Sequence, residues 1–331
     1  MKRCQQCVMP EVDNRIKMDE HGVCQLCHKH KSLQIPKAVQ SKYNLDALLK
    51  KVDTYKTATA GGYDCAVAIS GGKDSIMVLY LAKELLHLRP LGVFIDNGFM
   101  TSELYQNAIN AADSLGVDLV MFKTDLFKQV FKYILLTKQP FYYCRLCHAL
   151  IAKLVHDVAN LHGITLILGG FTKGQDFLKL PELFWIFKIT DDFVTNELSQ
   201  ESTFQEITEM FPNLAKYFSD RYSHIHEISP FWYVEWNEKE IIQTISDKAG
   251  FKVPTLSWPD RSSNCLFNFV SQHLAVRHFG YSQHEPELST LVRKNEMSRE
   301  RALDIVNTPI TQSHLDMVLD RMDLTYKDII E

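Results

Sequence analysis

A glycine-rich hexapeptide at residues 70–75 combines chemical groups that suit the binding of a phosphate. Its two glycines permit positive φ angles and close approach of the backbone, and the free N–H groups at the start of a following helix would add donors. The serines offer hydroxyls, the lysine a point charge, and the aspartate a carboxylate that can hold Mg²⁺ or fix the loop. A tight strand-to-helix turn would explain the glycines alone. The predicted phosphate-binding residues are Ser70, Gly71, Gly72, Lys73, Asp74 and Ser75.

The elements around this loop alternate between strands and helices. An apolar strand is expected directly before it, at residues 64–70, and a helix directly after it, at residues 75–87. Further strands are predicted at residues 91–95, 118–122 and 165–168, and further helices at residues 102–115, 130–136 and 146–161. This alternation predicts an α/β fold with a doubly wound parallel sheet, in which ligands bind at the carboxyl ends of the strands.

The alternation fades after residue 175, and the rest of the chain is expected to be smaller and mostly helical. An aromatic-rich region precedes a helix that should end at Gly250, and a second helix should begin at Ser298, which suits an N-cap. The helices predicted in this part cover residues 238–249, 298–306 and 311–322.

A second glycine-rich loop follows the fourth predicted strand, so it reaches the same edge of the sheet as the first. Gly169 and Gly170 are expected to close over a nucleotide, with Lys173 near its phosphates as a catalytic residue and Asp176 near the metal. An ordinary polar loop is the alternative interpretation.

Six of the eight cysteines stand in Cys-x-x-Cys pairs, which in a reducing compartment indicates metal or redox chemistry. The first two pairs are separated by a short polar segment and have the spacing of a zinc ribbon, in which two tight turns place four thiolates tetrahedrally around Zn²⁺. His28 and His30 are interpreted as solvated neighbours. The predicted zinc ligands are Cys4, Cys7, Cys24 and Cys27.

The other cysteines leave three interpretations open. Cys144 and Cys147 lie at the start of a predicted helix and, with Cys265, could bind three irons of a [4Fe-4S] cluster and leave the fourth iron open. Alternatively, the first two form a redox or sulfur-carrying pair that the helix N-terminus activates. Cys265 could also be a buried core residue.

The sequence SGGKDS resembles the signature of the PP-loop family of ATP pyrophosphatases, whereas the GxxxxGK[ST] pattern of a P-loop is absent. The resemblance implies cleavage of ATP to AMP and pyrophosphate, with the pyrophosphate in the loop. It also implies that the adenine rests near the end of the second strand, where Asp96 is the predicted cofactor-binding residue. The second cysteine set is similar to the cluster-binding motif pair of one branch of the PP-loop tRNA thiolases.

Motifs along nearly the whole chain resemble the N-acetyl sugar amidotransferase family. These are MKRCQQCVMPE with GVCQLC, the SGGKDS loop, FIDNGF, the CxxCH helix start and VRKNEMSRERAL. The resemblance implies conversion of a sugar acetamido group to an acetamidino group in surface-polysaccharide synthesis, with ammonia from a separate glutaminase.

Two departures from that family favour insertion of sulfur instead. LGGFTKGQ stands where a Trp-Gly-Glu ending is expected, and SSNC supplies an unexpected cysteine.

Amination and sulfur insertion share one step, because conversion of an amide or carbonyl oxygen into an AMP ester makes that oxygen a good leaving group. The alternative enzyme is a [4Fe-4S]-dependent sulfurtransferase that acts on a nucleotide, tRNA or another small acceptor with a separate sulfur donor. A non-catalytic nucleotide-binding or zinc scaffold is disfavoured by the intact Lys-Asp pair.

Composition bears on the partners and on the location. The net charge of −4 and the pI near 6.4 give no global attraction to nucleic acid, which favours a sugar nucleotide or nucleotide acceptor over tRNA. No signal peptide or membrane-spanning run is evident, so a cytoplasmic protein is expected.

The chain is predicted to have three parts: a zinc ribbon at residues 1–35, a PP-loop domain at residues 60–180, and an acceptor-binding, helical region at residues 181–331.

Overall fold

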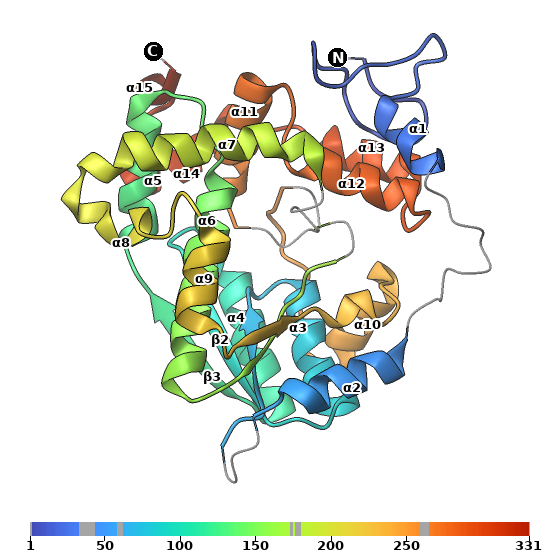
Figure 1. Cartoon of the computed structure of the whole chain (residues 1–331), viewed down its shortest axis with the longest axis vertical. Coiled ribbons are helices and arrows are strands. Elements are labelled where there is room, and N and C mark those ends of the chain that lie inside the picture. The colour runs from blue at the N-terminus through green and yellow to red at the C-terminus, as the bar shows by residue number, and fades with distance from the viewer. Residues whose placement is uncertain are drawn as a thin grey trace.

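A five-stranded parallel sheet organises the part of the chain that the computed structural model describes, namely residues 2–32, 44–57, 62–172, 175, 180–258 and 265–330 (Figure 1). The strand order is β3-β2-β1-β4-β5, so the chain winds outward on both sides of β1. The point at which the winding changes direction lies between β1 and β4, where open α/β sheets bind ligands. The strands are β1 (Cys65–Ile69), β2 (Pro90–Asp96), β3 (Asp118–Lys123), β4 (Leu166–Leu168) and β5 (His226–Ile228).

The sheet separates two apolar cores, because successive side chains of a strand point to opposite faces. In β1, Val67 and Ile69 pack into one core and Ala66 packs into the other. In β2, Phe94 belongs to the first core, and Val93 belongs to the second. Both faces of the sheet are therefore covered, as a parallel sheet requires.

Helices from distant parts of the chain cover these faces. The first core is closed by α2 (Leu45–Tyr55), α3 (Lys73–Tyr80), α4 (Ser102–Leu115) and α10 (Glu238–Ala249). The second core receives α5 (Leu126–Thr137), α6 (Tyr143–Leu161), α9 (Leu214–Tyr222), α11 (Phe267–Phe279) and α14 (Gln312–Leu319). Strand β5 belongs to the sheet and helix α10 packs on it, although both lie beyond residue 180. The sheet and its covering helices therefore extend past the predicted end of the PP-loop domain.

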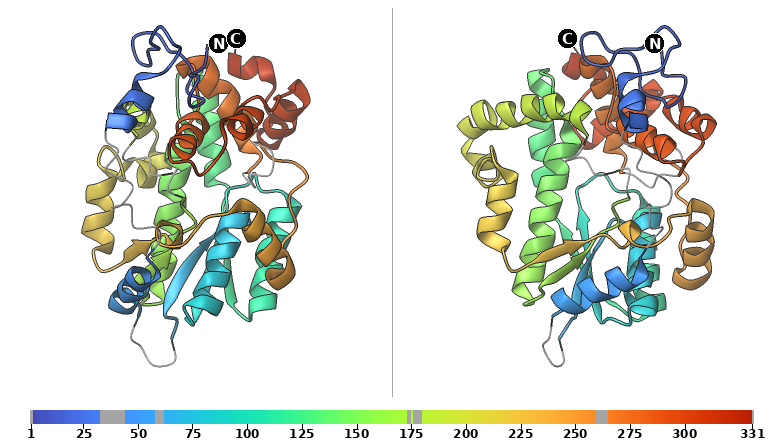
Figure 2. Two further views of the ribbon diagram at one scale, coloured as in Figure 1. Left: turned by 90° about the vertical axis from the view of Figure 1, so that its right-hand side faces the viewer. Right: turned by 45° about the vertical axis from the view of Figure 1, so that its right-hand side comes forward.

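The N-terminal segment and the C-terminal helices gather at one end of the molecule, with the sheet and α2 toward the other (Figures 1 and 2). The N-terminal segment contributes α1 (Gln25–Ser32). The remaining helices of this region and of the aromatic-rich region are α7 (Pro181–Asn196), α8 (Gln205–Thr208), α12 (His284–Arg293), α13 (Arg299–Val306) and α15 (Tyr326–Ile330). None of the described helices has the length and apolarity that a membrane crossing requires.

The structure confirms the predicted elements and refines their ends. The helix expected at residues 75–87 begins at Lys73 and passes into a π-helical turn at Leu81–Leu85. Gly250 ends α10 in the left-handed conformation, and the side chain of Ser298 accepts a hydrogen bond from the backbone N–H of Arg301. These ends follow from local backbone chemistry, which explains why the sequence reveals them.

Candidate active site

The phosphate loop crosses the edge of the sheet between β1 and α3. Gly71 has φ 74°, and a Cβ atom there would lie 2.1 Å from the carbonyl oxygen of Leu104 in α4, so no side chain fits. Gly72 is the N-cap of α3 and offers no capping side chain, which leaves the first N–H groups of the helix free to bind an anion.

The two serines hold the loop in shape. The Ser75 hydroxyl donates to the Gly72 carbonyl at 2.9 Å and accepts from the Ser70 backbone N–H at 3.1 Å. The Ser70 hydroxyl accepts from the Gly72 N–H at 3.3 Å. The side chain of Asn107 in α4 adds a further anchor, because its amide donates to the Gly71 carbonyl at 3.1 Å. This asparagine carries no sequence signal that could have identified it.

Lys73 and Asp74 meet at the start of α3. The Lys73 ammonium lies 3.2 Å from Asp74 and 3.9 Å from Glu238, the first residue of α10. Burial disfavours the charge of Lys73, but the two carboxylates outweigh burial and raise its pKa. The other Asp74 oxygen accepts a hydrogen bond from the indole of Trp236 at 2.7 Å. Trp236 and Glu238 were not predicted as site residues, and their contribution depends on the packing of α10 beside α3.

The second glycine loop lies against the first. A Cβ atom on Gly170 would approach the Ser75 backbone nitrogen to 3.1 Å, so this glycine permits close contact between the loop after β4 and the start of α3. Both Gly169 and Gly170 line the same cavity as the phosphate loop. Lys173 and Asp176, predicted near the phosphates and the metal, lie outside the described residues.

A cavity of about 310 Å³ opens over these loops, between the carboxyl edge of the sheet and helix α12. A neighbouring pocket of about 550 Å³ shares part of its wall with this cavity, the candidate nucleotide cavity. The residues that line both are Ala68, His148, Ile151, Val155, Gly169, Phe171, Gln175 and Gln283. A nucleotide in the first and an acceptor in the second could therefore meet.

Asp96 is not part of the cavity lining. Its carboxylate accepts a hydrogen bond from the Gly98 backbone N–H at 2.8 Å and lies 3.7 Å from the Lys123 ammonium. Instead, Val93 and Ile95 of the same strand line the nucleotide cavity. Strand alternation points these two side chains to the face opposite Phe94.

The second set of cysteines comes together around α6. Cys144 and Cys147 occupy its first turns, and Cys265 packs against the same apolar core as Cys147. The Asn97 side chain donates to the Cys147 sulfur at 3.7 Å and also bonds Cys265. Residues 261–264, which precede Cys265 in the SSNC motif, lie outside the described residues.

Burial governs the chemistry of these thiols. Desolvation raises the pKa of Cys144 to about 12, and it also raises the pKa values of Cys147 and Cys265. Burial therefore opposes the expected activation of Cys144 and Cys147 as thiolates by the helix N-terminus.

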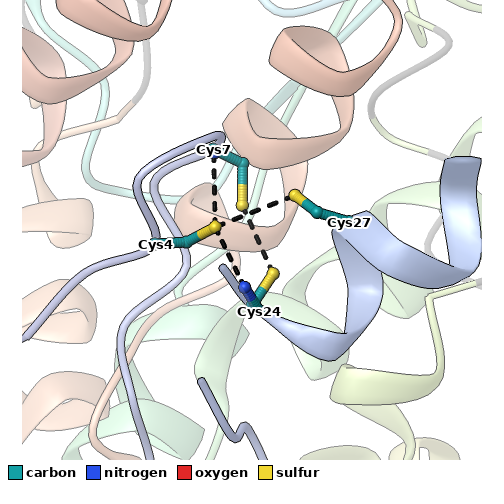
Figure 3. Close-up of side chains that lie close together, drawn as sticks. All are labelled: Cys4, Cys7, Cys24 and Cys27. Carbon is teal, nitrogen blue, oxygen red and sulfur yellow. Dashed lines mark hydrogen bonds between the residues drawn. The ribbon is translucent and has the colours of Figure 1, made fainter. Parts of the chain in front are cut away.

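The four N-terminal cysteines form a compact site for one metal ion. Figure 3 shows their sulfur atoms turned toward one another, with Cys4–Cys27 at 3.8 Å and Cys7–Cys24 at 3.7 Å. All four ligand atoms lie within 4.8 Å of one another and are buried. Thiolates about 2.3 Å from a tetrahedral ion stand about 3.8 Å apart, so the spacing fits such an ion. Hydrogen bonds among the four thiols lower the pKa values of Cys4 and Cys7 and raise those of Cys24 and Cys27.

His148 is a further candidate that the CxxCH motif contained but to which no role was assigned. It follows Cys147 on α6 and lines both pockets. Desolvation, with a smaller contribution from the charge of His284, lowers its pKa to about 4. The imidazole is therefore neutral at pH 7 and can accept a proton.

Known proteins resemble different parts of the chain. Residues 263–331 match the family described as LPS biosynthesis protein WbpG-like, C-terminal domain. The chain is 28% identical to the uncharacterized protein MJ1599 of Methanocaldococcus jannaschii over 272 residues, 80% of this chain and 81% of that protein. It is 31% identical to MJ1638 of the same organism over 117 residues, 34% of this chain and 44% of that protein.

Among solved structures, the U34-tRNA thiolase NcsA from Methanococcus maripaludis with its [4Fe-4S] cluster matches with a TM-score of 0.39 and 16% sequence identity. The match covers 92% of this chain and 89% of that chain. The glycine-rich loop at residues 70–75 thus lies at the carboxyl edge of a parallel sheet, in a chain whose residues 263–331 match the WbpG-like C-terminal domain family.

Proposed function

We propose that the chain is an enzyme that splits ATP to AMP and pyrophosphate and adenylates an amide or carbonyl oxygen of a small acceptor. The observation that carries this proposal is the shared wall between the nucleotide cavity, into which the phosphate loop opens, and the larger adjoining pocket. The loop supplies N–H donors and the charge of Lys73 to the phosphates, as stabilisation of a departing pyrophosphate requires.

Asp74 is the residue that would hold Mg²⁺, which would neutralise charge on the phosphates. The carboxylate suits this role because it lines the nucleotide cavity and is fixed from two sides, by Lys73 and by Trp236. Glu238 also lines the cavity and faces Lys73. These side chains can orient the triphosphate for attack by the acceptor oxygen on the α-phosphorus.

For the acceptor, we propose an N-acetyl sugar, in a step of surface-polysaccharide synthesis with ammonia from a separate glutaminase. Aromatic side chains, which can stack against the apolar faces of a sugar ring, make up much of the larger pocket, and Lys51 adds a positive charge suited to a sugar nucleotide. The aromatic lining residues are Tyr142, Phe171, Phe187, Phe218, Trp232 and Tyr233. The WbpG-like match is consistent with this pathway class.

The product assay tests the proposal. The purified chain is incubated with ATP, Mg²⁺, ammonium and a UDP-linked N-acetyl sugar, and nucleotide products are separated by chromatography. The expected result is AMP and pyrophosphate in equal amounts, with a mass change on the sugar of oxygen replaced by NH. ADP and phosphate as the stoichiometric products would contradict the class of reaction.

Sulfur transfer is the second candidate, and the grouping of Cys144, Cys147 and Cys265 favours it. Asn97 bonds both Cys147 and Cys265, and Cys144 and Cys147 belong to α6, the helix whose His148 lines the two pockets. Three thiolates that bind separate irons of a [4Fe-4S] cluster would leave the fourth iron open to bind sulfur. Loss of three thiol protons would accompany cluster binding.

Anaerobic purification with iron and sulfide analysis distinguishes the two candidates. About four irons per chain, lost on replacement of Cys147 by Ser, would support sulfur transfer. Cys65→Ala is the matched control, because Cys65 is a buried core cysteine of β1. Zinc alone, at about one ion per chain in the four N-terminal cysteines, would support amination.

A further inference from the structure

Helix α12 contacts the N-terminal metal segment along one face. Glu285, Ser289 and Arg293 are spaced by four residues and so share that face. Glu285 accepts a hydrogen bond from Arg3, and the Ser289 hydroxyl accepts one from the Val8 backbone N–H at 3.3 Å.

Two arginines connect the C-terminal helices to the cysteine loop itself. Arg293 of α12 lies 3.7 Å from the Cys7 sulfur. The guanidinium of Arg299, the first residue of α13, donates to the Cys4 carbonyl at 2.9 and 3.1 Å and to the Cys7 carbonyl at 3.0 Å. One side chain therefore holds both ends of the first Cys-x-x-Cys turn.

The opposite face of α12 forms a wall of the nucleotide cavity. His284, Glu287, Leu288 and Leu291 line that cavity, and the charge of Glu287 contributes to the raised pKa of Lys73. The helix therefore stands between the metal segment and the phosphate loop.

Val8 completes the connection through apolar packing. It directly follows Cys7, is fully buried, and packs in one cluster with Leu288, Ala302 and Ile305. Leu288 and Ile305 also line the nucleotide cavity. Because protein interiors are close-packed, a displacement of the cysteine turn would move these side chains.

We propose that the N-terminal metal centre positions α12, so that metal occupancy sets the affinity of the cavity for its nucleotide. Arg299 is the positioning residue that transmits this effect. The proposal rests on the proposed function only in taking ATP as the ligand of the cavity. Its physical basis is that metal binding supplies folding energy to a small segment, and α12 packs on that segment.

The experiment uses the full chain and measures two quantities, hydrogen exchange of α12 and the Kd of ATP with Mg²⁺. Removal of the metal with a chelator should speed exchange of α12 and weaken ATP binding by about tenfold or more, whereas re-addition of Zn²⁺ should restore both. Arg299→Gln should retain its metal and yet show both effects, because it removes hydrogen bonds made by a charged group. Arg299→Lys should rescue part of the loss.

Arg301→Gln is the matched control on the same helix, since none of the described hydrogen bonds joins the Arg301 side chain to the cysteine turn. Unchanged exchange of α12 after metal removal would overturn the proposal, and so would a normal ATP Kd in the metal-free chain. A native chain that binds no ATP would instead contradict the proposed function, and the exchange of α12 would still decide whether the metal positions that helix.

Discussion

The indole Nε1 of Trp236 donates a hydrogen bond to Oδ1 of Asp74 at 2.7 Å. The other carboxylate oxygen, Oδ2, lies 3.2 Å from the Lys73 ammonium. Trp236 belongs to the segment between β5 and α10, so a residue far along the chain orients the candidate Mg²⁺ ligand of the phosphate loop.

Replacement of Trp236 by Phe should raise the Mg²⁺ concentration at which ATP binding is half-maximal, by up to about tenfold, because a hydrogen bond to a charged group is lost. The aromatic ring remains, so packing should change little. Titration of ATP binding with Mg²⁺ measures the effect, and binding of ATP without Mg²⁺ is the control. An identical Mg²⁺ dependence in both proteins would remove Trp236 from this role.

Replacement of Lys73 by Ala should lower turnover by about a hundredfold or more, because the lysine stabilises developing charge on the phosphates. The fold should survive, although Asp74 and Glu238 lose their buried cation and some stability with it. Steady-state assays and thermal unfolding measure the two effects. Lys83→Ala, at a half-buried lysine that lines neither pocket, is the control. Full activity in the Lys73 variant would place its side chain outside the reaction.

Replacement of Cys24 by Ser should remove the N-terminal metal and loosen or aggregate residues 2–32, because such a segment depends on metal for its folding. The phosphate loop should keep its conformation, since its hydrogen bonds lie within β1, α3 and α4. Metal analysis and hydrogen exchange along the chain test both statements. His28→Gln should retain the metal, because His28 pairs with Asp19.

Replacement of His148 by Gln should lower turnover by about a hundredfold with little change in ATP affinity, if the imidazole accepts the proton that the acceptor nitrogen loses. In the native enzyme, the acid limb of the pH profile of kcat should lie near pH 4, where His148 takes up a proton. That limb should be absent from the variant. An unaltered rate and profile would contradict the assignment.

The same histidine makes a prediction about stability. An unfolded histidine takes up its proton near pH 6.5, whereas the folded His148 does so near pH 4, so the unfolded state binds more protons between these values. The contribution of neutral His148 to the free energy of unfolding is therefore fully present above pH 6.5 and declines as the pH falls toward 4. Denaturant titrations should show a shallower decline in His148→Gln over this window.

Local pattern was sufficient to predict much of the fold. The strands β1 to β4 follow from short apolar segments, and α4 and α10 follow from clear start and stop residues such as Gly250. In contrast, β5 spans only His226–Ile228, and α11 is buried on nearly all sides. A strand of three residues is too short to show an alternation of apolar and polar residues. A helix that is buried on nearly all sides lacks the contrast between an apolar and a polar face by which a helix is recognised in a sequence.

The sequence by itself determined the groups whose chemistry depends on neighbours along the chain. Residues 70–75 form a loop suited to a phosphate because glycines, serines and a helix start suffice to shape one, and the two N-terminal Cys-x-x-Cys pairs can each hold two metal ligands within one turn. Only the tertiary structure decided which distant side chains join them. Trp236 reaches Asp74, Arg299 reaches the cysteine turn, and His148 faces two pockets, because packing of α10, α13 and α6 sets those contacts, and packing has no short-range signature.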